Sequence, residues 1–143
     1  MSIKSEKIAA VILTFAGRND DPHYLAFFDC FNRGLFFEAH EVLEVLWLQD
    51  RSGPEGDFYK GLIQLAGAFV HIQKGRHGPA SSLFRLAEKN FAKFPREHQK
   101  LNLREVRNHI QRCLDMIGKP PFGNTGPLTA PHLKLREPLS GPA

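Results

Sequence analysis

Hydrophobic positions along this chain recur every three or four residues, the spacing of helices that bury one face. Glycine and proline interrupt that spacing and indicate where each helix begins and ends. No run alternates between apolar and polar residues over the length of a strand, and no Asn-Gly or Asp-Gly turn joins two β-branched runs. The pattern predicts six helices, over about residues 4–16, 22–33, 36–49, 57–74, 79–94 and 103–117.

Short connections between these helices favour antiparallel neighbours. We therefore predict an all-α fold, a small antiparallel bundle of five or six helices, with residues 1–117 as a single domain. Residues 118–143 lack periodicity and contain six of the ten prolines. They predict an extended or disordered Pro/Gly-rich tail that lies on the domain through its apolar residues, which are Phe122, Leu128, Leu133 and Leu135.

The predicted helix over residues 36–49 is apolar almost all round but carries four ionisable side chains. These are Glu38, His40, Glu41 and Glu44. Because polar groups that leave water must find partners, a second element is expected to face them.

The predicted helix over residues 57–74 offers such partners. One stripe along it consists of Gly61, Gln64, Ala68 and His71. Gly61 and the nearby Gly67 each cost a helix roughly 1 kcal/mol relative to alanine, and close approach of another helix usually offsets that cost. If the two helices form an antiparallel hairpin, Glu44 lies near Gln64. The spacing therefore predicts that Gln64 and His71 face the acids and imidazole of the first helix.

Three interpretations of this cluster stay open. The first is a site for a divalent metal or a small polar ligand, with His40, Glu41, Glu44 and His71 as metal ligands and Glu38 and Gln64 contacting the ligand. The second is acid–base catalysis by a hydrolase or isomerase that uses Glu44 and His40. The third is a buried structural network. The string His40-Glu41-x-x-Glu44 lacks the second histidine of a zincin helix, which excludes a metalloprotease of that kind.

Two strings of residues resemble a known family. They are Phe31-Asn32-x-Gly34-x-Phe36-Phe37-Glu38-Ala39-His40-Glu41-x-Leu43-Glu44-x-x-Trp47 and Lys60-Gly61-Leu62-Ile63-Gln64-x-Ala66-x-Ala68-x-x-His71-x-x-x-Gly75. Over about residues 24–90 the chain resembles the family known as domain of unknown function 309. The resemblance implies a small fold of packed antiparallel helices and no established activity.

Charge is unevenly distributed, although the net charge is only +4. Residues 35–60 carry six acidic and two basic side chains, whereas residues 85–115 carry four acidic and eight basic ones. Seven of the basic residues recur at steps of three or four, namely Arg85, Lys89, Lys93, Arg96, Lys100, Arg104 and Arg107. This face predicts an alternative function, an interaction module that binds nucleic acid or an acidic partner. Pro95 and interspersed glutamates favour a solvated surface over a nucleic-acid site.

The remaining features concern compartment and assembly. Cys30 and Cys113 have no partner at metal spacing, and no disulfide framework is expected. The apolar run from Ile8 to Ala16 is short and helical in spacing, so we expect no signal peptide. No stretch reaches the length of a membrane span, and a soluble cytoplasmic protein is expected. Assembly into a homo-oligomer is left open.

Overall fold

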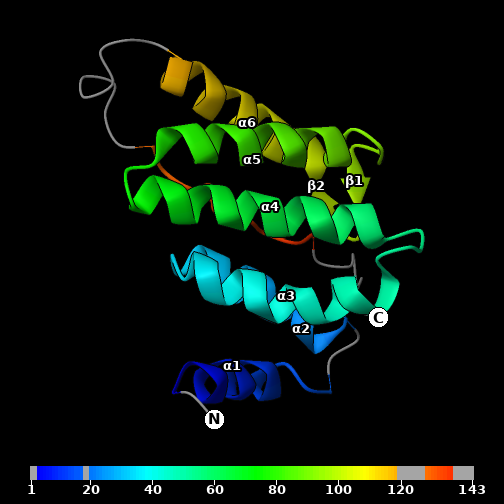
Figure 1. Ribbon diagram of the computed structural model, residues 1–143. Coiled ribbons are helices and arrows are strands. Elements are labelled where there is room, and N and C mark those ends of the chain that lie inside the picture. The colour runs from blue at the N-terminus through cyan, green and yellow to red at the C-terminus, as the bar shows by residue number, and fades with distance from the viewer. Residues whose placement is uncertain (1–2, 18–19, 119–127, 137–143) are drawn as a thin grey trace.

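Six helices account for most of the computed structural model, which describes residues 3–17, 20–118 and 128–136. They are α1 (Ile3–Thr14), α2 (Pro22–Asn32), α3 (Phe36–Asp50), α4 (Gly56–Gln73), α5 (His77–Phe91) and α6 (Leu103–Gly118). The helices stack in chain order from α1 to α6, and α2 lies behind α3 (Figure 1). The predicted all-α bundle is confirmed, and each predicted helix end lies within three residues of the observed one.

Capping residues, proline and glycine mark the ends of the helices, as the sequence predicts. Asp21 caps α2 by accepting a hydrogen bond from the backbone N–H of His23 at 2.7 Å, and Pro22 occupies the first turn. Gly34 and Gly75 follow α2 and α4 with φ of +76° and +71°. Such left-handed conformations favour glycine and end a helix sharply.

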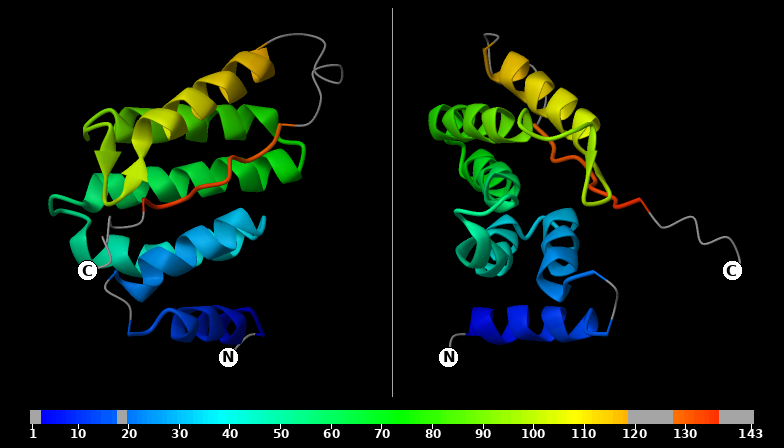
Figure 2. Two further views of the ribbon diagram at one scale, coloured as in Figure 1. Left: turned by 180° about the vertical axis from the view of Figure 1, so that it is seen from behind. Right: turned by 90° about the vertical axis from the view of Figure 1, so that its right-hand side faces the viewer.

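Phenylalanine side chains join the layers of the bundle. Six of them are less than 2 % exposed, namely Phe27, Phe31, Phe58, Phe69, Phe84 and Phe91. Phe69 of α4 is central, because its ring centroid lies 5.4 Å from that of Phe36 in α3 and 5.2 Å from that of Phe84 in α5. Helix α4 therefore packs between α3 and α5 (Figures 1 and 2).

A small hairpin precedes α6 and was not predicted. Its strands, β1 (Glu97–His98) and β2 (Leu101–Asn102), pair antiparallel over two residues each. The two turn residues Gln99 and Lys100 have φ of +45° and +66°, a conformation that costs energy for side chains other than glycine. Because neither residue is a typical turn former, sequence alone gave no signal for this hairpin.

The C-terminal segment lies on the bundle as predicted, within the range that the structure describes. Residues 128–136 extend across α4 between α6 and α2 (Figure 2). Leu133 is buried, and Leu128 and Leu135 are partly buried against the core. The predicted contact of Phe122 lies outside the described residues. Among those that are described, no helix combines the length and apolar character needed to cross a membrane.

Candidate functional site

The acidic and histidine side chains of α3 lie near the protein surface. His40 Nε2 is 3.4 Å from Glu44 Oε2 one turn later, and both side chains are about one-third to one-half exposed. The Phe37 ring lies 5.9 Å from the His40 imidazole and is itself 45 % exposed. Farther along α3, the Lys60 ammonium of α4 lies 4.3 Å from the centroid of the Trp47 ring. The Trp47 contact agrees with an antiparallel α3–α4 hairpin.

The glycine seam of α4, formed by Gly61 and Gly67, does not face α3. A methyl group at Gly61 would come within 2.6 Å of the Phe91 ring of α5, and one at Gly67 within 3.2 Å of Leu83. The prediction that these glycines admit α3 is therefore wrong. Helix α4 has a neighbour on each side, and its glycine face receives the aromatic ring of α5.

Gln64 lies on the same face of α4 as the two glycines and also contacts α5. It is 8 % exposed, and its side-chain oxygen accepts a hydrogen bond from Asn90 Nδ2 of α5 at 2.8 Å. This bond directs the oxygen towards α5, whereas the proximity of Gln64 to Glu44 of α3 stays a prediction. The role of Gln64 and Glu38 in binding a ligand remains a prediction.

His71 has one unusual feature. Its Nδ1 is buried and has no hydrogen-bond partner among the described residues. In residues 3–17, 20–118 and 128–136, however, no three His, Cys, Asp or Glu side chains are grouped so that they could hold a metal ion. Metal binding by His40, Glu41, Glu44 and His71 thus remains a prediction that this geometry does not support.

A different polar cluster, the Glu55 cluster, joins three elements and was missed. It consists of Tyr24 of α2, Glu55 and Tyr59 at the start of α4, and His98 and Gln99 of the hairpin. The His98 Nε2–H donates to Glu55 Oε1 at 2.6 Å, and the Gln99 amide donates to the same oxygen and to the Tyr59 hydroxyl. The Tyr24 hydroxyl donates to the Gln99 carbonyl at 2.8 Å. These bonds hold the strained turn in place.

Burial governs the ionisation of the two tyrosines in this cluster. It raises the pKa of Tyr24 far above the usual value, and the nearby Tyr59 and carboxylates raise it further. Burial also raises the pKa of Tyr59, partly opposed by its hydrogen bond from Gln99. Both hydroxyls are therefore neutral at physiological pH. The His98 ring lies 4.8 Å from that of Phe58 and 4.7 Å from that of Phe94, so aromatic side chains hold it in place beside Glu55.

The basic residues of the second half separate into paired and unpaired groups. Lys93 lies 2.7 Å from Asp57, and Lys100 lies 3.0 Å from Asp20. Arg107 donates to both oxygens of Glu88, at 2.7 Å from Nη2 and 3.1 Å from Nε, and these bonds raise its pKa. Arg96 and Arg104 are exposed and have no carboxylate partner within the described part of the chain.

The two unpaired arginines border a hollow, the arginine groove, between the end of α5 and α6. It has a volume of about 580 Å³ and is lined by Glu88, Phe94, Pro95, Arg96, Leu103, Arg104, Arg107, Asn108 and Gln111. Three guanidinium groups and one carboxylate give the lining a formal charge of +2. Apolar side chains form part of its wall, so the groove combines cationic and hydrophobic contacts.

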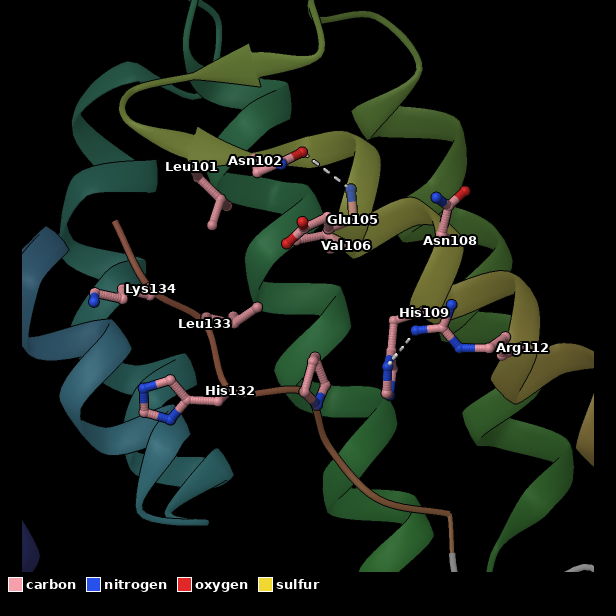
Figure 3. A pocket seen from close by; sticks show the side chains of 11 residues that line it. Leu101, Asn102, Glu105, Val106, Asn108, His109, Arg112, His132, Leu133 and Lys134 are labelled. Carbon is pink, nitrogen blue, oxygen red and sulfur yellow. Dashed lines mark hydrogen bonds between the residues drawn. The ribbon is translucent and has the colours of Figure 1, made fainter. Parts of the chain in front are cut away.

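A second hollow of about 330 Å³ lies between α6 and residues 128–136 (Figure 3). Arg112 Nη2 donates to His109 Nδ1 at 3.3 Å, and the His109 Nε2–H donates to the carbonyl of Thr129 at 2.8 Å. Asn108 borders this hollow and the arginine groove alike.

Comparison with known proteins agrees with the resemblance noted from the sequence. Residues 24–83 match the family described as Domain of unknown function (DUF309). This part of the chain is similar to a DUF309 domain. A curated relative from Aquifex aeolicus (strain VF5), described as an uncharacterized protein, is 30 % identical over 92 residues, which cover 63 % of this chain and 28 % of the relative. The chain thus spans less than a third of the length of that relative. No solved structure matches this chain.

The DUF309 region and the arginine groove occupy different parts of the fold. The matched residues include most of α2, all of α3 and α4 and the start of α5, whereas every residue that lines the groove follows Leu83. One residue of the DUF309 strings, Asn32, has a contact that was not anticipated, because its side-chain amide binds the backbone of Leu133. The spacing of Leu133 and Leu135 places both on one side of an extended strand, but it gives no signal for Asn32 as the partner.

Proposed function

We propose that this protein is a binding module whose arginine groove holds a short acidic segment of a partner protein. The observation that carries the proposal is the pair Arg96 and Arg104, two exposed guanidinium groups at one hollow without a carboxylate partner in the described residues. Three other basic residues of the same stretch are neutralised by acids of this chain.

The chemistry of the lining suits carboxylates. A guanidinium group presents a planar pair of donors that matches the two oxygens of a carboxylate. Glu88 already binds Arg107 in this way. Phe94, Pro95 and Leu103 offer apolar contact for the stems of glutamate side chains.

The distribution of charge favours an acidic segment over nucleic acid. Non-specific binding of a duplex depends on neutralising several phosphates along its length. Here Arg96 and Arg104 lie at one hollow, while Lys93 and Lys100 are bound to Asp57 and Asp20. A compact site for a few carboxylates fits this arrangement better than a row of phosphate contacts.

The test uses the full chain and a short fluorescein-labelled polyglutamate peptide, with binding followed by fluorescence anisotropy. The Arg96→Ala/Arg104→Ala variant is expected to weaken binding at least tenfold, since each charge-assisted hydrogen bond contributes about 1.5–3 kcal/mol and about 1.4 kcal/mol is a factor of ten. Arg85→Ala/Lys89→Ala is the matched control, because it removes the same charge from exposed positions of α5 outside the groove. Equal losses in the two variants would contradict the proposal.

A second arm replaces the peptide with an arbitrary DNA duplex over a range of salt concentrations. We expect weaker binding than to the peptide. Tighter binding with a steep dependence on salt would instead support the nucleic-acid alternative and exclude the acidic segment as the main partner.

The His/Glu site on α3 and α4 is a second candidate, favoured by the buried Nδ1 of His71, which finds no hydrogen-bond partner in the part of the chain that the structure describes. In this proposal His40, Glu41, Glu44 and His71 bind a divalent metal, and Glu38 and Gln64 contact a small polar ligand. Metal analysis of protein purified without a His-tag, beside Glu41→Ala and His71→Ala, provides the test. If the wild type contains no metal and its melting temperature does not rise when metal is added, the cluster is structural.

We further propose that the protein works in the cytoplasm. Cys30 and Cys113 are both buried and free, which suits a reducing compartment.

A further inference from the structure

Residues 128–136, here called the strap, bind the bundle as an extended strand would. Burial alternates along the strap, with Leu133 4 % exposed and its neighbours His132 and Lys134 exposed. In Figure 3, Leu133 points towards α6 whereas His132 and Lys134 point the other way. A period of two is the pattern of a strand that has one buried face.

Asn32 of α2 takes the place of a neighbouring strand. Its Nδ2 donates to the Leu133 carbonyl at 2.7 Å, and its Oδ1 accepts from the Leu133 N–H at 2.8 Å. The side-chain amide therefore satisfies both backbone groups of one strap residue. A backbone amide pairs in the same way across a sheet.

Other backbone contacts fix the two ends of the strap. The Arg136 N–H donates to the Lys100 carbonyl at 2.7 Å, and Leu135 forms an antiparallel bridge with Leu101. His109 binds the Thr129 carbonyl near the other end. The seat formed by Asn32, β2 and α6, here called the strap groove, therefore recognises the main chain of a strand and the leucines on its buried face.

We propose that the strap groove is an interaction surface for a second copy of this chain, which inserts its own residues 128–136 in reciprocal exchange. A second copy supplies the one segment observed to fit the seat. Each contact of the strap is regained in the partner's groove, so exchange loses none of the hydrogen bonds or buried leucine surface described above. Swapping an identical element is in general a low-cost route to a symmetric dimer.

Exchange requires a connection between α6 and the strap that is long enough to reach a second copy. Residues 119–127 join the two, and nine residues span up to about 30 Å when extended. Within one chain the strap competes at an effective concentration of the order of millimolar. The dimer is therefore expected to grow with protein concentration.

The first experiment uses two pools of the wild-type chain, labelled at the N-terminal amine with a donor or an acceptor dye. Mixing them at increasing concentration is expected to produce energy transfer, which excess free peptide of residues 128–136 abolishes. Absence of transfer up to millimolar protein overturns the proposal. Transfer that the peptide leaves unchanged also overturns it, because the dimer then uses another surface.

A complementary pair of variants makes the test directional. Asn32→Asp removes the donor of the groove and keeps the strap, whereas Leu133→Asp spoils the strap and keeps the groove. Each variant alone is expected to lose energy transfer, and a mixture of the two is expected to regain part of it. His132→Ala, at an exposed strap position, is the control and should behave as wild type. Circular dichroism checks that both variants remain helical, and the wild-type experiment stands without them. Equal transfer in the wild type and both single variants overturns the proposal.

Discussion

Helix α5 has a closed side towards α4 and an open side towards α6. On the closed side, the Phe91 ring packs on Gly61, and Gln64 is bonded to Asn90. On the open side, Arg96 and Arg104 border a groove without a carboxylate partner in the described residues. The comparison teaches that a polar side chain bonded to its neighbour serves packing, whereas a charge left unpaired at a hollow is available to bind.

The same comparison changes the interpretation of the Gly-Leu-Ile-Gln string. Gly61 and Gln64, the first and last residues of that string, both lie on the closed side. Their spacing suggested a ligand site, but their neighbours are a ring and an amide of α5. Periodicity identifies the face of a helix, and the tertiary partner decides what that face does.

The largest change in the free energy of unfolding is expected when a packed side chain is removed from the interface between α4 and α5. Phe91→Ala removes a fully buried ring and should lower the free energy of unfolding by about 3–5 kcal/mol. Gly61→Ala alone should cost about 1–3 kcal/mol through overpacking against that ring. In the Phe91→Ala background the same change should stabilise by up to about 1 kcal/mol, because alanine favours the helix. Urea unfolding of the four proteins measures this reversal of sign.

Gly67→Ala is the control for that cycle. Its added methyl group would lie 3.2 Å from the movable end of Leu83, so a near-neutral change is expected. If Gly61→Ala were equally destabilising with and without Phe91, the contact with the ring would not explain the glycine.

A second prediction concerns the buried face of α6, where the side chain of Cys113 is 3 % exposed. Burial raises the pKa of Cys113 from 9.0 to about 11. Below pH 9 the thiol is neutral in folded and unfolded chains, and its stabilising contribution is fully present. As pH rises from 9 through 11, the unfolded thiol ionises before the folded one, and up to about 3 kcal/mol should be lost at about 1.4 kcal/mol per unit.

Cys113→Ala should flatten this part of the pH profile of unfolding free energy. Tyr24 and Tyr59 still contribute an alkaline loss in both proteins, so the difference between the profiles isolates the thiol. Identical slopes between pH 9 and 11 would show that the buried face of α6 admits water.

The smallest change in stability is expected on the open side. Arg107 and Glu88 are 40 % and 30 % exposed, and such a pair contributes about 0–1 kcal/mol. Glu88→Gln should therefore cost less than about 1 kcal/mol in urea unfolding. It also removes the one carboxylate of the groove, so binding of polyglutamate should tighten several-fold in the anisotropy assay. Weaker binding would mean that Glu88 positions Arg107 for the ligand.

Much of the fold could be predicted because local signals determine it. Pro22, Gly34 and Gly75 act within a few residues of the helix ends that they mark. The bond between Asn32 and Leu133 joins residues 101 positions apart, and no local pattern encodes such a contact. The hairpin turn was missed for a related reason, since distant Tyr24 and Asp20 hold Gln99 and Lys100 in left-handed conformations.

The candidate site was harder to predict than the fold. Unpaired and paired arginines look alike in the sequence. Only the tertiary structure shows that Glu88 binds Arg107, while Arg96 has no acidic partner among the described residues. His98 likewise has no acid at helical spacing, because its partner Glu55 is supplied by another helix.

The hydrogen bonds of Glu55 restrict the orientation of α6, which forms one wall of the arginine groove. Glu55 lies at the N-terminal end of α4 and holds the hairpin from which α6 begins. Any tilt of α6 must break these bonds or carry the end of α4 with it. These bonds therefore restrict the width of the arginine groove. In the proposed complex, selectivity depends on how well an acidic segment matches that width.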